Sequence, residues 1–158
     1  MIALACVLFL AQGCAHATVE VTPVGTVVRS AGLNAQAALA EINAFRRKHG
    51  LKPLMLDQRL SKAAALQARD QARRGKIGHQ GADGSKPRQR AERAGYKPNL
   101  TAENVASGQK SFRQAMRGWE RSPVHKRNLL LPTAEAAGIA VSYRNGRAYY
   151  TLVLGSER

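Results

Sequence analysis

Three side chains of this 158-residue chain could act together as acid–base groups, metal ligands or ligand contacts: His79, Glu103 and His125. Two neutral imidazoles and one carboxylate could hold a zinc ion that keeps a water in an open position. The same set could form a hydrogen-bonded acid–base pair whose pKa values depend on burial. Neither histidine lies in a dense ligand motif such as His-x-x-x-His, and each taken alone is typical of a capping or loop-bracing histidine. The three are candidates for catalysis, and none is assigned a catalytic role.

Cysteine chemistry is excluded from the body of the chain. Both cysteines, Cys6 and Cys14, lie in or beside an apolar segment at the N-terminus. The domain must therefore fold without disulfides, and it has no thiolate to serve as a metal ligand or nucleophile. Ser122 has no adjacent base in the sequence, and capping of a helix explains it better than a nucleophilic role.

The elements that position the three candidates follow from local signals. A helix with Asp57 as its N-cap ends at Gly75 and Gly78, which delivers His79 into a glycine-rich loop. Residues 100–106, which contain Glu103, are expected to be extended or irregular. Ser122-Pro123 is expected to open a helix that carries His125, with the serine as cap and the proline at the first helical position.

Further elements surround them. One helix is expected from Asn34 to about Gly50, with His49 on its apolar stripe as a structural histidine. A short basic helix begins at residues 85–87 and ends at Gly95. A helix that begins at Ser111, with Gln114 in a capping box, turns Trp119 toward the core. Residues 138–143 and 149–154 flank Asn145-Gly146, which predicts a hairpin.

Helices come first along the chain and strands last. That order predicts an α+β fold in which helices cover a small antiparallel sheet, and it disfavours a doubly wound parallel sheet.

Four stretches, in this order and spacing, resemble the bacterial branch of the CAP superfamily of cysteine-rich secretory, antigen 5 and pathogenesis-related proteins, whose domain is also called the SCP domain. They are Asn43-x-x-Arg46 with His49-Gly50-Leu51-x-Pro53-Leu54, then His79, then Glu103-Asn104-Val105-Ala106-x-Gly108, and last Trp119-x-x-Ser122-Pro123-x-His125-x-x-Asn128. The resemblance covers residues 33–155. It implies a three-layer α-β-α sandwich with a cleft lined by two histidines and acidic residues.

The resemblance also assigns the cleft residues. His79 matches the first histidine, Glu103 the first glutamate, and His125 the histidine of the bacterial Ser-Pro-Gly-His motif. Where animal and plant members have a second glutamate, this chain has Ser122, and Glu120 is expected to point elsewhere. The ligand cleft is therefore expected at His79, Glu103, Ser122 and His125. A divalent metal such as zinc at His79 and His125 is the weaker expectation, because the acidic set is incomplete.

The N-terminus is typical of an export signal. Residues 1–17 read as a signal peptide with two competing processing sites: a lipobox that would lipidate Cys14, and the small-x-small sequence Ala15-His16-Ala17. Residues 18–32 are expected to be a tether or a loosely attached strand. We therefore expect a periplasmic or extracellular protein, or a lipoprotein tethered to the membrane.

The net charge of the chain indicates which class of binding partner it favours. With 25 Lys and Arg against 10 Asp and Glu, the net charge is +15, which favours anionic partners. The cations are spread along the chain, so a basic surface that is solvated and binds no partner explains the charge equally well. The leading hypothesis is a binding module for lipid or anionic envelope components. The alternatives are a metal-dependent or His/Glu-based hydrolase and, disfavoured by the 5% aromatic content, a nucleic-acid-binding protein. The oligomeric state is not indicated.

Overall fold

The computed structural model of the chain describes residues 19–21, 27–30 and 32–158. The expected signal peptide over residues 1–17, with its candidate lipidation site Cys14, lies outside the described residues. No helix of the described part is long and apolar enough to cross a membrane.

One sheet runs through the molecule, with the strand order β1-β2-β5-β6-β4, and β3 pairs with β5 beside this path. The strands are β1 (Val19–Val21), β2 (Val27–Ser30), β3 (Met55–Leu56), β4 (Pro98–Ser107), β5 (Ala136–Arg144) and β6 (Arg147–Glu157). β5 and β6 form the expected hairpin, since Asn145 and Gly146 take φ values of 48° and 79°, as a two-residue primed turn requires.

The outer edge of β5 is shared by two short strands. β2 pairs antiparallel with its end, at Ser142 to Arg144, whereas β3 pairs with its start, at Ala136 and Ala137. The β3 pairing is parallel, so the sheet is mixed rather than purely antiparallel as expected. Because β2 occupies only part of this edge, the remaining length is left for β3. The segment expected as a tether or loosely attached strand thus contains two strands that extend the sheet.

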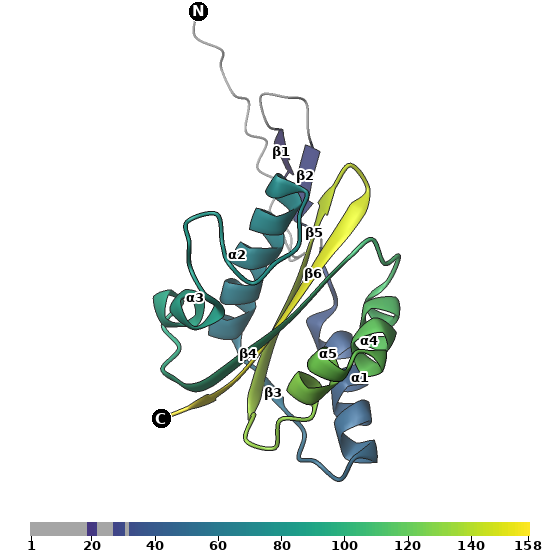
Figure 1. Ribbon diagram of the computed structural model, residues 1–158, viewed down its shortest axis with the longest axis vertical. Helices are drawn as coiled ribbons and strands as arrows, with labels where there is room; N and C mark the ends of the chain where they lie inside the picture. Colours follow the sequence, from purple (N-terminus) through teal and green to yellow (C-terminus); the bar gives the residue numbers. More distant parts are fainter. Residues whose placement is uncertain (1–18, 22–26, 31) are drawn as a thin grey trace, which may run out of the picture.

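Helices cover both faces of the sheet (Figure 1): α2 and α3 lie on one face, and α1, α4 and α5 on the other. They are α1 (Ala35–Lys48), α2 (Gln58–Arg74), α3 (Pro87–Arg93), α4 (Phe112–Arg121) and α5 (Pro123–Leu129). This is the α-β-α sandwich expected from the sequence.

Local signals set most helix ends. The side chains of Asn34, Asp57 and Ser111 each accept a backbone N–H in the first turn of α1, α2 and α4, as expected of N-caps. Gly75 ends α2 in the left-handed conformation, at φ 67°. The capping box of α4 differs by one residue, because the Gln114 side chain accepts from the N–H of residue 110 instead of Ser111.

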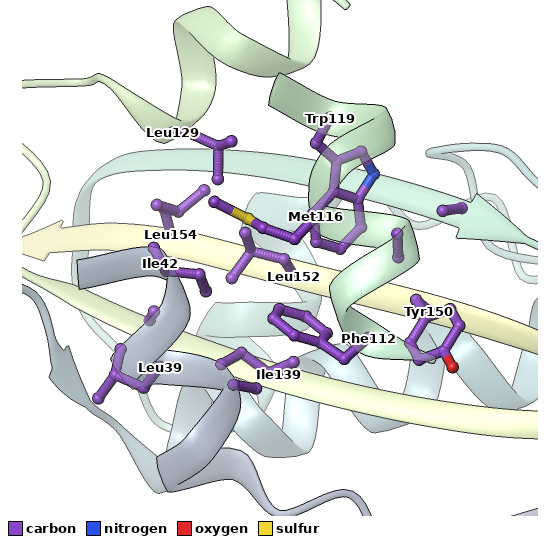
Figure 2. Packing of buried hydrophobic residues seen from close by; sticks show 14 of the residues in the cluster. Leu39, Ile42, Phe112, Met116, Trp119, Leu129, Ile139, Tyr150, Leu152 and Leu154 are labelled. Carbon is purple, nitrogen blue, oxygen red and sulfur yellow. The ribbon is translucent and has the colours of Figure 1, made fainter. Parts of the chain in front are cut away.

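The main core lies between the sheet and α1, α4 and α5 (Figure 2). Successive residues of β6 point to opposite faces, so Tyr150, Leu152 and Leu154 enter this core while Val153 packs under α2. Trp119 of α4 is 1% exposed and satisfies its indole N–H by donating to the carbonyl of Val105 on β4 at 3.1 Å. The expectation that Trp119 belongs to the core is confirmed.

Two positions fix helices against the rest of the fold. At Gly138 on β5, an added Cβ would lie 2.0 Å from the carbonyl carbon of Leu60, so only glycine lets α2 cross the sheet this closely. Arg46 of α1 is fully buried, which lowers its pKa. It donates to the carbonyls of residues 52, 129, 131 and 134, and so joins α1 to the segment after α5.

Candidate functional site

Glu103 is the buried centre of the candidate site. β4 turns its side chain toward the layer of α2 and α3, where it is 1% exposed. Oε2 accepts from Nη2 of Arg90 at 2.7 Å, and Oε1 lies 3.0 Å from Nδ1 of His79. Each carboxylate oxygen therefore has a nitrogen partner, one of them permanently charged.

Arg90 was not recognised from the sequence. It lies on α3 and is 3% exposed, because α3 packs on both α2 and β4. Besides Glu103, it binds the carbonyl of Ser85 at 2.7 Å and the carbonyl of His79 at 3.1 Å. The guanidinium thus holds the loop after α2 against β4. No local pattern marks this arginine among its exposed basic neighbours, since its burial comes from packing alone.

His79 presents part of its imidazole to solvent. Its side chain is 55% exposed although Nδ1 is bound to Glu103. The hydrogen bond to Glu103 raises the pKa of His79 above its ordinary value, against smaller opposing effects of burial and of the Arg90 charge. The loop is held from behind by Gln67, whose side-chain amide donates to the carbonyl of Gly78.

His125 is brought to the same edge of the sheet by α5. Its backbone carbonyl accepts from the Asn104 side chain at 3.0 Å, and Asn128 donates to Oδ1 of Asn104 at 2.9 Å and to the carbonyl of Glu103 at 3.2 Å. The two asparagines thus join α5 to β4. Burial, followed by the charge of His79, lowers the pKa of His125. The pKa values of His79 and His125 are thus shifted in opposite directions.

The other expected residues have different positions. Ser122 lies half-buried at the junction of α4 and α5, but its side chain makes no capping hydrogen bond, contrary to expectation. Because it ends one helix and begins the next, its backbone N–H and carbonyl bond to α4 and α5 instead. Glu120 lines a hollow of about 380 Å³ between α1 and α4. His49 lines the same hollow and is exposed, with Nδ1 bound to the carbonyl of Phe45, so it is satisfied but not buried on an apolar stripe.

Glu103 has no free oxygen to offer a metal ion in this arrangement. Both oxygens of Glu103 are engaged, one of them by the Arg90 cation, which would repel a bound metal. Over the described part of the chain, no three His, Cys, Asp or Glu side chains gather closely enough to hold a metal ion.

Comparisons with known proteins agree with this fold. The model of the cysteine-rich secretory protein family, CAP, matches residues 39–154. The uncharacterized protein YkwD of Bacillus subtilis is 32% identical over 126 residues, which cover 79% of this chain and 49% of that protein. The chain thus spans about half the length of that relative.

Two solved structures share the fold at low sequence identity. An outer surface protein from Borrelia burgdorferi superposes with a TM-score of 0.75 at 24% identity, over 82% of this chain and 98% of that one. An extracellular protein containing an SCP domain from Bacillus anthracis gives 0.70 at 22% identity, over 83% of this chain and 46% of that one.

Proposed function

The chain belongs to the cysteine-rich secretory protein family, CAP, and from that premise we propose that it is an exported, non-catalytic module that binds lipid or anionic components of the cell envelope. Export is supported by the apolar N-terminal segment and by the similar folds of proteins described as outer surface and extracellular. The net charge of +15 favours anionic ligands over neutral or cationic ones.

One observation carries the proposal: His79 is a half-exposed imidazole whose pKa is raised by a buried carboxylate. Nδ1 is bound to Glu103, so the ring is fixed and its second nitrogen points away from that carboxylate. A protonated ring in this position donates to an anionic oxygen from outside. A phosphate or carboxylate headgroup is such an acceptor.

The same contacts argue against catalysis by Glu103. A general base or nucleophile needs a free carboxylate oxygen, whereas both oxygens of Glu103 are bonded and its side chain is 1% exposed. In this proposal Glu103 holds and charges His79, Arg90 holds Glu103, and His125 completes the contact surface from α5.

The test is a titration of the full chain with a soluble, short-chain phosphatidylglycerol, followed by the NMR signals of the histidine rings. We expect the signals of His79 and His125 to shift, with affinity falling as the pH rises through the raised pKa of His79. His79→Ala should abolish the effect. His49→Ala is the matched control, since His49 is exposed and lies elsewhere. Equal binding by the two variants would refute the assignment of the site.

An acid–base hydrolase is the second candidate, favoured by the opposite pKa shifts of His79 and His125. Two titratable groups whose surroundings push their pKa values apart are typical of general acid–base catalysis. Hydrolysis of ester and amide probes, compared between the parent chain and His125→Ala, tests this candidate. A zinc titration of the same two proteins tests the metal-dependent version, and equal negligible binding would remove it.

A further inference from the structure

The outward face of α2 carries a half-exposed leucine among basic side chains. Leu66 is 50% exposed, whereas Leu60 of the same helix is fully buried. Lys62 precedes Leu66 by four residues and Arg69 follows it by three, so helical spacing places both beside it. An aliphatic side chain in contact with water is thus flanked by cations on the same surface.

A hollow of about 360 Å³ lies at this leucine, between α2 and α3. Half of its lining is basic and half is apolar: Lys62, Arg69 and Arg93, with Ala65, Leu66 and Ala94. No acidic residue lines it, so the charge of its lining favours an anion.

These cations are available to an outside partner. Lys62 and Arg69 make no hydrogen bond or ion pair with any described residue. Arg93 pairs with Asp83, but both side chains are more than half exposed, and exposed ion pairs are weak enough for an outside anion to replace. The one acidic residue of α2, Asp70, is bound to Arg74 at 2.6 Å.

We infer that this face of α2 and α3 docks on the surface of an anionic lipid bilayer. Leu66 enters the interface between headgroups and acyl chains, while Lys62, Arg69 and Arg93 lie at the level of the lipid phosphates. A soluble polyanion would pair with the cations but leave Leu66 in water, so the apolar centre favours the bilayer.

This surface is separate from the site proposed above to bind ligands. The hollow at Leu66 shares no lining residue with His79, Glu103 and His125. Docking orients the domain on the membrane, whereas the His79 site selects a ligand. Either proposal can therefore be refuted while the other stands.

The test uses the full chain carrying Leu66→Trp, with vesicles that contain phosphatidylglycerol and brominated acyl chains, which quench an indole inside the bilayer. The native Trp119 is 1% exposed and contributes a constant background. We expect quenching of the added indole, none with phosphatidylcholine alone, and less at high salt. Lys62→Gln or Arg69→Gln in this background should raise the half-saturating lipid concentration about fivefold each.

Met55→Trp is the matched control, because Met55 is 72% exposed on β3 and does not line the hollow. We expect little quenching there. A Leu66→Trp chain with an unchanged circular dichroism spectrum and no quenching would overturn the inference, as would equal quenching at both positions. A response to soluble polyphosphate without quenching by vesicles would assign the face to a polymer and also overturn it. Adding His79→Ala to Leu66→Trp should leave the quenching unchanged.

Discussion

Glu103→Gln is the substitution that tests the site most directly. It keeps the size of the side chain and removes its negative charge, so Arg90 is left without a counter-charge at 4% side-chain exposure. It also removes the group whose hydrogen bond and charge raise the pKa of His79, while the Arg90 charge that lowers this pKa remains. The pKa of His79 should therefore fall, and the domain should lose stability.

The size of the stability loss follows from burial. Breaking a buried ion pair by neutralising one partner typically costs about 3–5 kcal/mol, because the other charge stays desolvated. For a domain of this size, that loss corresponds to a fall in Tm of about 10–20 °C. Glu92→Gln makes the same chemical change in the exposed Arg88–Glu92 pair, where the side chains are 41% and 48% exposed. Its expected cost is under about 1 kcal/mol.

Thermal and urea unfolding give the free energy of unfolding of each variant, and an NMR titration of the histidine rings gives the pKa of His79. We expect a large loss of stability and a lower pKa for Glu103→Gln, and neither change for Glu92→Gln. Equal loss of stability in the two variants would show that the buried pair has no special role. An unchanged His79 titration in Glu103→Gln would refute the hydrogen bond on which the proposed function rests.

Three further outcomes are expected. Arg46→Met leaves buried carbonyls without a donor and should cost about 3–5 kcal/mol in urea unfolding, whereas the exposed Arg47→Met should stay within about 0.5 kcal/mol. Gly138→Ala places a Cβ against the backbone of α2 and should cost at least about 3 kcal/mol, measured by thermal unfolding. The stability from His79 is complete below its ordinary pKa of 6.5 and is lost as the pH rises through the raised value. The stability from His125 is complete above 6.5 and is lost as the pH falls through the lowered value. The free energy of unfolding of the parent chain, measured across this pH range, should contain both dependences on pH. His79→Gln should lose the first dependence and His125→Gln the second.

The fold was largely predictable because its boundaries are set by local chemistry. Asn34 and Asp57 cap helices through their own side chains, and Gly75 and Asn145-Gly146 take left-handed conformations that few other residues adopt. The parallel pairing of β3 was not predictable in this way. A two-residue strand has no periodicity, and its partner is decided by the space that β2 leaves on β5.

The candidate site was predictable only in part. The contact between His79 and Glu103, 24 residues apart, matches the positions that the family resemblance assigned. Arg90 was missed, since its burial depends on α3 packing against α2 and β4 and on no feature of its own neighbours. Ser122 was placed correctly at a helix junction, but the expected capping hydrogen bond of its side chain is not formed, and nothing in the structure explains its absence.

β4 and β1 are the two edge strands of the sheet (Figure 1). The unpaired carbonyls of an edge strand can accept hydrogen bonds from a strand of another molecule. Here Trp119 of α4 and Asn128 of α5 donate their side-chain N–H groups to the carbonyls of Val105 and Glu103, two residues apart along this strand. An incoming strand would have to displace two helices and expose a buried indole. The bonds that position the candidate site thus also protect the molecule against edge-to-edge aggregation, in a domain without disulfides to hold its sheet together.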